Sequence, residues 1–285
     1  MDVIQWFTAP LQHEFMLKAI LVSALVGIVC SALSCYMTLK GWALMGDAVS
    51  HAVMPGVVIA YVLNIPFAVG AFVFGVGSVV AIGFIKSQTR IKEDAVIGLV
   101  FTGFFALGLV LVSKVKSGID LTHILFGNVL GISDADIVQT VIISVVTLVT
   151  LAILSKDLIL FCFDSTHARS IGLNITFLHY VLLSLLSLTA VAGLQTVGII
   201  LVVAMLVTPG ATAYLLTDRF DHMVLIAMAS GVFSSVVGTY ISYHIDGATG
   251  GCIVVLQTLL FVIAMIFAPK HGLLVRSKKQ LTEPL

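Results

Sequence analysis

Charged residues are scarce in this chain of 285 residues: aspartate, glutamate, lysine and arginine together contribute 10%, against about 25% in soluble domains. Hydrophobic residues contribute 60%, and the mean hydropathy is +1.17. The formal net charge is zero, so the charge balance indicates neither a nucleic-acid partner nor an acidic one. This composition excludes a soluble globular protein and indicates a membrane protein.

Cysteine is also rare, with four residues in the whole chain. Cys30 and Cys35 are five positions apart, whereas neighbours on one helix face are three or four apart. We therefore expect the cysteines to be small buried apolar residues, and we expect neither disulfides nor metal–thiolate ligation.

Motifs of hydrolytic enzymes are missing as well. The sequence contains no G-x-x-x-x-G-K-[ST] phosphate loop, no H-E-x-x-H pair and no G-x-S-x-G elbow, the motifs that mark nucleotide, metalloprotease and esterase chemistry. We expect a protein that is not an enzyme, and energy for its work from another subunit or from an ion gradient.

Apolar runs of about 20 residues, the length that crosses the hydrocarbon core as a helix, recur along the whole chain. They predict an all-α, polytopic membrane protein in which residues 1–285 form a single transmembrane domain. The first run has no basic leader or cleavage site, so we expect it to be retained as a span. About nine transmembrane helices are predicted, with a range of eight to ten, near residues 17–39, 45–64, 66–86, 94–113, 137–154, 174–192, 196–216, 222–242 and 250–268.

Lysine and arginine in the short loops set the expected orientation, because they are enriched on the cytoplasmic side. With nine spans and a cytoplasmic carboxyl tail at residues 270–285, the amino terminus lies outside. Only Lys18, Lys114 and Lys116 of the fourteen basic residues then fall outside. The other eleven fall inside.

Two connections are longer than a turn. Residues 114–136 are moderately apolar, and we expect an interfacial or re-entrant segment there. Within 155–174, Asp164 is placed to cap a short helix, a polar run continues to Ser170, and Gly172 is suited to the position after its end. This predicts a brief helix at residues 163–173 on the cytoplasmic surface.

Rows of small residues predict close helix packing in lipid. Gly27 and Ser31 form one such row, and Ser230, Ser234 and Gly238 form another.

An aspartate and a histidine interrupt the second apolar run, in the stretch GDAVSHAVMPG at residues 46–56. Ionisable groups at this depth are costly and usually face a cavity or a partner. Asp47 and His51 are four positions apart, which places both on one helix face, and carboxylate and imidazole suit divalent first-row cations. Pro55 cannot donate to the carbonyl of His51, so we expect a kink there. The spacing alone fits three roles: metal ligation, a tie between two helices, or a proton relay.

Several longer stretches resemble one family. They are LKGWALMGDAVSHAVMPG (39–56), RIKEDAVIGLVFTGFFALGL (90–109), FGNVLGIS (126–133), FDSTHARSIGLN (163–174), LQTVGIILVVAMLVTPGATAYLLTDRF (194–220) and GATGGCIVVLQTLLF (247–261). Over residues 10–275 the chain resembles the integral-membrane permeases of ABC-type importers for zinc, manganese and iron. It is more similar to the enterobacterial permeases for chelated iron and manganese than to those dedicated to zinc.

The resemblance implies a set of partners in the bacterial cytoplasmic (inner) membrane. They are a second permease subunit, identical or paralogous, two cytoplasmic ATPase subunits, and a binding protein that delivers metal from outside. No resident cofactor is implied; manganese, ferrous iron or zinc is the transported substrate.

The resemblance also implies roles for individual residues. Asp47 and His51 match the motif that supplies ligands to the metal pathway. The segment FDSTHARSIG matches the coupling helix that docks on the ATPase, and the matching positions are Asp164, His167, Ala168, Arg169 and Gly172. His167 is then an interface residue and not a metal ligand.

Three rival functions follow from the same residues. A zinc importer of the same family would use the same two ligands. A proton-coupled secondary carrier would use Asp47 and His51 as a relay. An intramembrane enzyme is the third rival, although the sequence shows no catalytic constellation.

Overall fold

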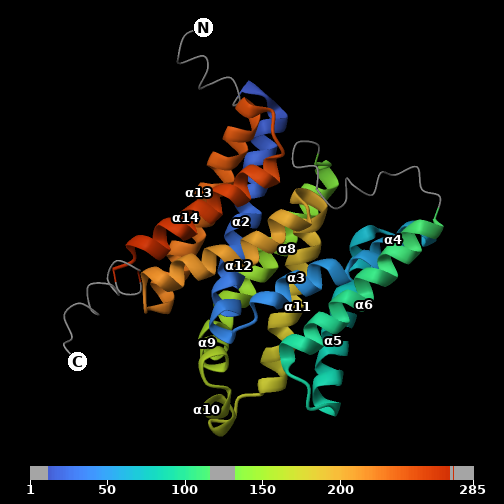
Figure 1. The fold of residues 1–285 in the computed structure, drawn as a ribbon, viewed down its shortest axis with the longest axis vertical. Coiled ribbons are helices and arrows are strands. Elements are labelled where there is room, and N and C mark those ends of the chain that lie inside the picture. Colours follow the sequence, from blue (N-terminus) through green and yellow to red (C-terminus); the bar gives the residue numbers. More distant parts are fainter. Residues whose placement is uncertain (1–11, 116–131, 270–271, 273–285) are drawn as a thin grey trace.

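The protein is helical throughout the part that the computed structural model describes, residues 12–115, 132–269 and 272. Nine helices within that part are long and apolar enough to cross a membrane, which confirms the predicted all-α polytopic fold (Figure 1). Residues 116–131 of the predicted outer segment and nearly all of the predicted tail at 270–285 lie outside the described residues.

The described helices follow one another with short connections. They are α2 (Glu14–Lys40), α3 (Ala43–Ala52), α4 (Met54–Leu63), α5 (Phe67–Gln88), α6 (Glu93–Lys114), α8 (Asp134–Ile153), α9 (Ser155–Phe163), α10 (Ser165–Ser170), α11 (Ile175–Val197), α12 (Ile199–Leu216), α13 (Phe220–Ile245) and α14 (Thr249–Phe267).

Helix α2 is the centre of one group of helices. It packs against α12 and α13, and α14 packs against both of these. The contact between α2 and α13 depends on small residues, because a Cβ atom at Gly27 would lie 2.8 Å from the hydroxyl of Ser235 and 3.1 Å from the carbonyl oxygen of Gly231. Gly231 in turn lies against the hydroxyl of Ser31. The predicted close packing through Gly27 and Ser31 is confirmed.

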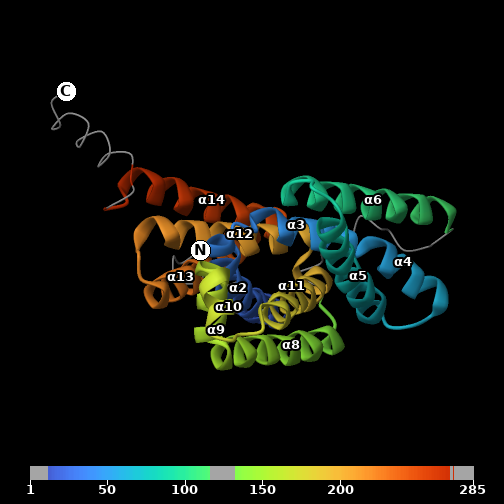
Figure 2. The same ribbon diagram turned by 90° about the horizontal axis from the view of Figure 1, so that it is seen from below.

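A second group contains α4, α5 and α6, which pack on one another. Figure 2 shows this group on the opposite side of the molecule from α12, α13 and α14. Helix α3 lies between the two groups and contacts α5 and α6 on one side and α11 and α12 on the other. The element that carries Asp47 and His51 therefore lies where the two groups meet.

The predicted second span is divided into two helices. Helix α3 ends at Ala52, and α4 begins at Met54 with Pro55 in its first turn. A proline has no N–H to donate and is accommodated best at a helix start. The interruption lies where the sequence predicts a kink, and Val53 and Met54 are buried within the protein.

Several boundaries differ from the prediction; α11, for example, continues to Val197 where an end near residue 192 is predicted. Residues 155–163 form helix α9, whereas the sequence predicts that they are part of a loop. Helix α8 begins at Asp134, earlier than predicted, because the hydroxyl of Ser133 accepts a hydrogen bond from the backbone N–H of Asp136 and caps the helix.

We expect Gly27→Ala to destabilise the fold. The added methyl group would meet the backbone of Gly231, which cannot move without shifting α13, and overpacking of this kind costs about 1–3 kcal/mol. Thermal unfolding of the detergent-solubilised protein checks this, with a thiol-reactive dye that reports exposure of the buried Cys30, Cys35 and Cys162.

Gly77→Ala is the matched control, because a Cβ atom at Gly77 would meet nothing within 4 Å. Equal melting temperatures for the two variants would contradict the close approach of α2 and α13.

Candidate functional site

Asp47 and His51 lie together on α3, as their spacing predicts. Nδ1 of His51 is 3.1 Å from Oδ1 of Asp47 and 3.0 Å from the Asp47 backbone oxygen. With its proton on Nδ1, the imidazole donates to Asp47 and presents Nε2 as an electron-pair donor. A carboxylate that orients an imidazole through its second nitrogen is the usual support of a metal-binding histidine.

The pair lies on a face of α3 that other helices cover only in part. Leu44 is 57% exposed, and the side chains of Asp47 and His51 are 38% and 22% exposed. These positions are three and four residues apart, so they share a face. The opposite face is covered: a Cβ atom at Gly46 would lie 3.3 Å from the side chain of Leu206 in α12.

Two phenylalanines of α6 hold the imidazole in place. The rings of Phe101 and Phe105 meet His51 nearly edge-on, with centroids 5.1 and 5.4 Å away. Close to this contact, Gly108 allows α6 to approach the start of α4, where a Cβ atom would lie 3.3 Å from the ring of Pro55. The sequence analysis did not single out these phenylalanines, because aromatic residues in an apolar span look like ordinary core.

Asp47 and His51 would be an incomplete ligand set for a metal ion. They offer two ligands, and no cluster of three or more histidine, cysteine, aspartate or glutamate side chains occurs among the described residues. Divalent first-row cations bind more ligands than two. Because the pair is also partly exposed, further ligands have room to approach it.

The second set of predicted residues forms a capped helix at the tip of the molecule. Helix α10 lies at the lower end in Figure 1, away from α3. Oδ1 of Asp164 accepts hydrogen bonds from the backbone N–H groups of Thr166 and His167, both at 2.9 Å. Gly172 has φ of 90°, which ends the helix. The predicted cap at Asp164 and the predicted glycine after the helix end are confirmed, but α10 (Ser165–Ser170) is shorter than the predicted 163–173 because Phe163 is the last residue of α9.

The side chains of α10 differ in exposure. Ala168 is fully buried, whereas His167 and Arg169 are exposed. The hydrogen bond from the His167 backbone is the main reason why the pKa of Asp164 lies below its usual range. Burial raises the pKa in opposition, and the bond from Thr166 lowers it further.

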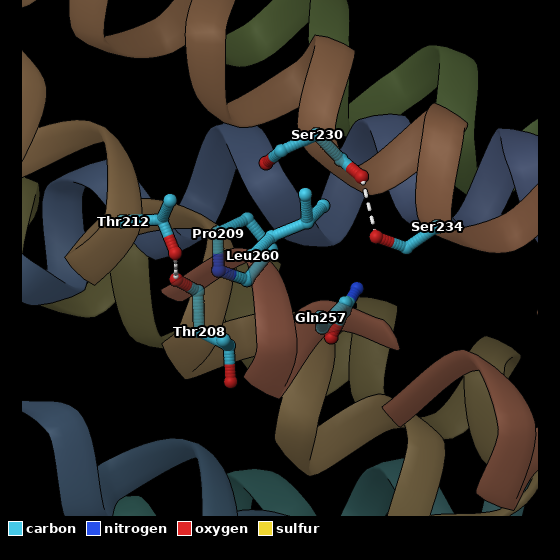
Figure 3. A pocket seen from close by; sticks show the side chains of 7 residues that line it. All are labelled: Thr208, Pro209, Thr212, Ser230, Ser234, Gln257 and Leu260. Atoms are coloured by element: carbon cyan, nitrogen blue, oxygen red, sulfur yellow. Dashed lines mark hydrogen bonds between the residues drawn. The ribbon is translucent and has the colours of Figure 1, made fainter. Parts of the chain in front are cut away.

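A polar crevice between α12, α13 and α14 was not anticipated from the sequence. It is lined by Thr208, Pro209, Thr212, Ser230, Ser234, Gln257 and Leu260 and leaves no room for a water molecule. Figure 3 shows the amide of Gln257 beside these groups. Gln257 is 2% exposed, and neither of its amide atoms has a hydrogen-bond partner within the described part of the chain. The hydroxyls of Thr212 and Ser234 bond to carbonyls of their own helices.

Nine candidate spans around an intramembrane aspartate–histidine pair define a polytopic membrane protein of the kind that moves solutes across a bilayer. The chain belongs to the ABC 3 transport family, whose family model matches residues 12–268.

Individual relatives cover nearly the whole chain. The manganese transport system membrane protein MntB of Synechocystis is 63% identical over 98% of this chain and 91% of its own length. The chelated iron transport system membrane protein YfeC of Yersinia pestis is 52% identical over 95% of this chain and 92% of its own. The solved structure of PsaBC from Streptococcus pneumoniae in complex with Fab matches with a TM-score of 0.88 and 39% identity, over 96% of this chain and all of that one.

We expect Asp164→Ala to loosen the start of α10. Hydrogen exchange at the amides of Thr166 and His167 should speed up, because both lose their acceptor. In the unaltered protein the protection should persist at every pH above the ordinary carboxyl pKa of about 3.9. It should disappear only as the pH falls through the lower folded-state value.

Asn174→Ala is the control for this measurement. Asn174 caps α11 by accepting from the backbone N–H of Phe177 at 3.0 Å, so its loss should leave the amides of α10 unchanged. Exchange at Thr166 that is equally fast in both variants would contradict the local cap.

Proposed function

We propose that this chain is the permease subunit of an ATP-driven importer for divalent transition metals, with manganese or iron as the substrate. The names of its relatives support the substrate class: MntB belongs to a manganese transport system and YfeC to a chelated iron transport system. The observation that carries the proposal is the Asp47–His51 pair on the partly exposed face of α3.

The geometry favours ligation over a structural tie. A tie between two helices requires a bond from α3 to another helix, whereas Asp47 and His51 bond to each other within α3. A pair that is already matched on one helix and partly exposed adds little to packing. It does present a carboxylate oxygen and an imidazole nitrogen on the same side, which are ligands suited to manganese, ferrous iron and zinc.

A second permease subunit, either this chain or a paralogue, would complete the site. A partner placed against the partly exposed face of α3 could add its own ligands to those of Asp47 and His51. The assembly proposed here also includes two cytoplasmic ATPase subunits and an external binding protein, in the bacterial cytoplasmic membrane. The amino terminus is then outside and the carboxyl terminus inside.

Helix α10 is proposed as the coupling helix that docks on an ATPase subunit. Its exposed His167 and Arg169 are available to a partner, while Ala168 anchors it on the permease. Asp164 and Gly172 fix where it begins and ends. This role places the α10 end of the molecule in the cytoplasm.

A zinc importer of the same family is the second candidate. Affinity for a nitrogen and oxygen site rises from manganese through iron toward zinc, so the ligand pair itself does not favour manganese. A secondary carrier that uses the pair as a proton relay would move metal without ATP, and this separates it from the importer.

Asp47→Ala and His51→Ala should each abolish uptake. Loss of a supporting group near a metal already costs about 10- to 100-fold in affinity or activity, and loss of a ligand should cost at least as much. The measurement is uptake of radioactive manganese, ferrous iron and zinc, with and without ATP, in vesicles that contain the whole transporter.

Asp221→Asn is the control, since Asp221 is an exposed carboxylate in the first turn of α13. It should transport normally. Normal uptake by Asp47→Ala would refute the ligand role, zinc-only uptake would support the second candidate, and uptake without ATP would support a secondary carrier.

A further inference from the structure

Four side chains meet where α2 passes into α3: three come from helices, and the fourth lies in the connection between α2 and α3. They are Lys40 at the end of α2, Trp42 just before α3, Phe161 in α9 and His179 in α11. We name this group the aromatic clamp. Trp42 is 5% exposed and Phe161 is 2% exposed, so the clamp is an interior contact.

Lys40 joins the end of α2 to α9 in two ways. Its Nζ atom lies 4.0 Å from the centroid of the Phe161 ring, which is the geometry of a cation–π contact. The same atom donates a hydrogen bond of 3.2 Å to the backbone oxygen of Phe161. This one cation therefore contacts both the ring and the backbone of a single residue.

Trp42 extends this contact to the start of α3. Its ring meets His179 nearly perpendicularly at 5.1 Å and Phe161 at 6.4 Å. Its backbone oxygen accepts a hydrogen bond from Met45 in the first turn of α3. The indole thus fixes the point at which α3 begins, and Asp47 is five residues further along.

On its amino-terminal side, Trp42 is joined to α2 through the backbone of Gly41. Gly41 has φ of 74°, and the backbone N–H groups of Gly41 and Trp42 donate to the carbonyls of Thr38 and Met37, which caps the end of α2. Trp42 is therefore joined to α2 through its backbone and to α9 and α11 through its ring. A shift of α9 would therefore move the base of α3.

Phe161 also lies close to α10. Asp164, which caps α10, is three residues further along, and its backbone N–H donates to the carbonyl of Leu160, the residue before Phe161. Phe161 is therefore less than one helical turn from the start of α10, and a displacement of α10 would move Phe161 as well.

We propose that the aromatic clamp transmits movement of α10 to α3, and that Trp42 and Phe161 are positioning residues for Asp47 and His51. This inference rests on the proposed function, in which α10 receives the movement from an ATPase subunit. The clamp touches neither metal nor nucleotide, so its loss should separate ATP hydrolysis from transport and leave both partners bound.

The test compares ions moved per ATP hydrolysed in vesicles that contain the complete transporter. Trp42→Ala and Phe161→Ala should lower this ratio between about 2- and 30-fold, the range of coupling changes caused by residues between two sites. ATP hydrolysis, copurification of the ATPase and manganese binding by the detergent-solubilised complex should be unchanged. Trp42→Phe, which keeps an aromatic ring, should restore most of the ratio.

Tyr36→Ala is the matched control. Tyr36 is a buried aromatic residue near the same end of α2, but its ring packs on Phe220 of α13 at 4.9 Å. Truncation there removes comparable packing from the other side of α2, and the ratio should not change. If Tyr36→Ala lowers the ratio as much as Trp42→Ala, the clamp has no special role and the proposal fails.

Lys40→Met tests the cation without opening a cavity, because methionine retains most of the alkyl chain. It should lower the ratio in the same direction, and an unchanged ratio in both Lys40→Met and Trp42→Ala would overturn the proposal. The unaltered complex is measured first. If the unaltered complex moves neither manganese nor ferrous iron with ATP, the proposed function itself is wrong. That complex carries no clamp substitution, so this failure is distinct from a failure of the clamp proposal.

Discussion

Within hydrocarbon every backbone N–H and carbonyl needs a partner inside the protein, and this constraint governs the whole structure. It requires helices across the bilayer, and it allows a helix to break only where protein surrounds the break. The interruption at Val53 meets this condition, because Val53 and Met54 are buried between the two groups of helices.

Two kinds of contact hold the groups of helices together, and they differ in how they respond to movement. Between α2 and α13 the backbones approach through Gly27 and Gly231, and no side chain separates them. Around α3 the contacts are made by larger and more varied groups, including Phe101, Phe105 and Trp42. Glycine-based packing resists sliding because any shift brings backbone onto backbone. Ring contacts tolerate small rotations, so the ring contacts around α3 restrict movement less than the glycine contacts between α2 and α13.

Local patterns were enough to predict the features that depend on a few neighbouring residues. The lengths of the apolar runs predicted the membrane spans. Pro55 indicated the break before α4, and Asp164 with Gly172 indicated where α10 begins and ends. Contacts between distant segments were not predictable in this way. The spans are apolar on all sides, so their periodicity does not reveal which face meets which neighbour. The clamp, the phenylalanines beside His51 and the Gln257 crevice all depend on such contacts, and α9 was missed because its nine residues are too few to show a helical period.

The position of Asp47 and His51 along α3 has an electrical consequence. His51 lies eight residues after the first residue of α3, which is about 12 Å along a helix axis, and the pair lies within the candidate membrane span Leu44–Leu63. An elementary charge that crosses a membrane gains or loses about 2.3 kcal/mol per 100 mV, and a divalent ion experiences twice the force. In the proposed importer, an ion bound by this pair would already have traversed part of the voltage drop. An interior-negative membrane would then help to load the site and oppose release back to the outside, and this contribution to import would need no conformational change.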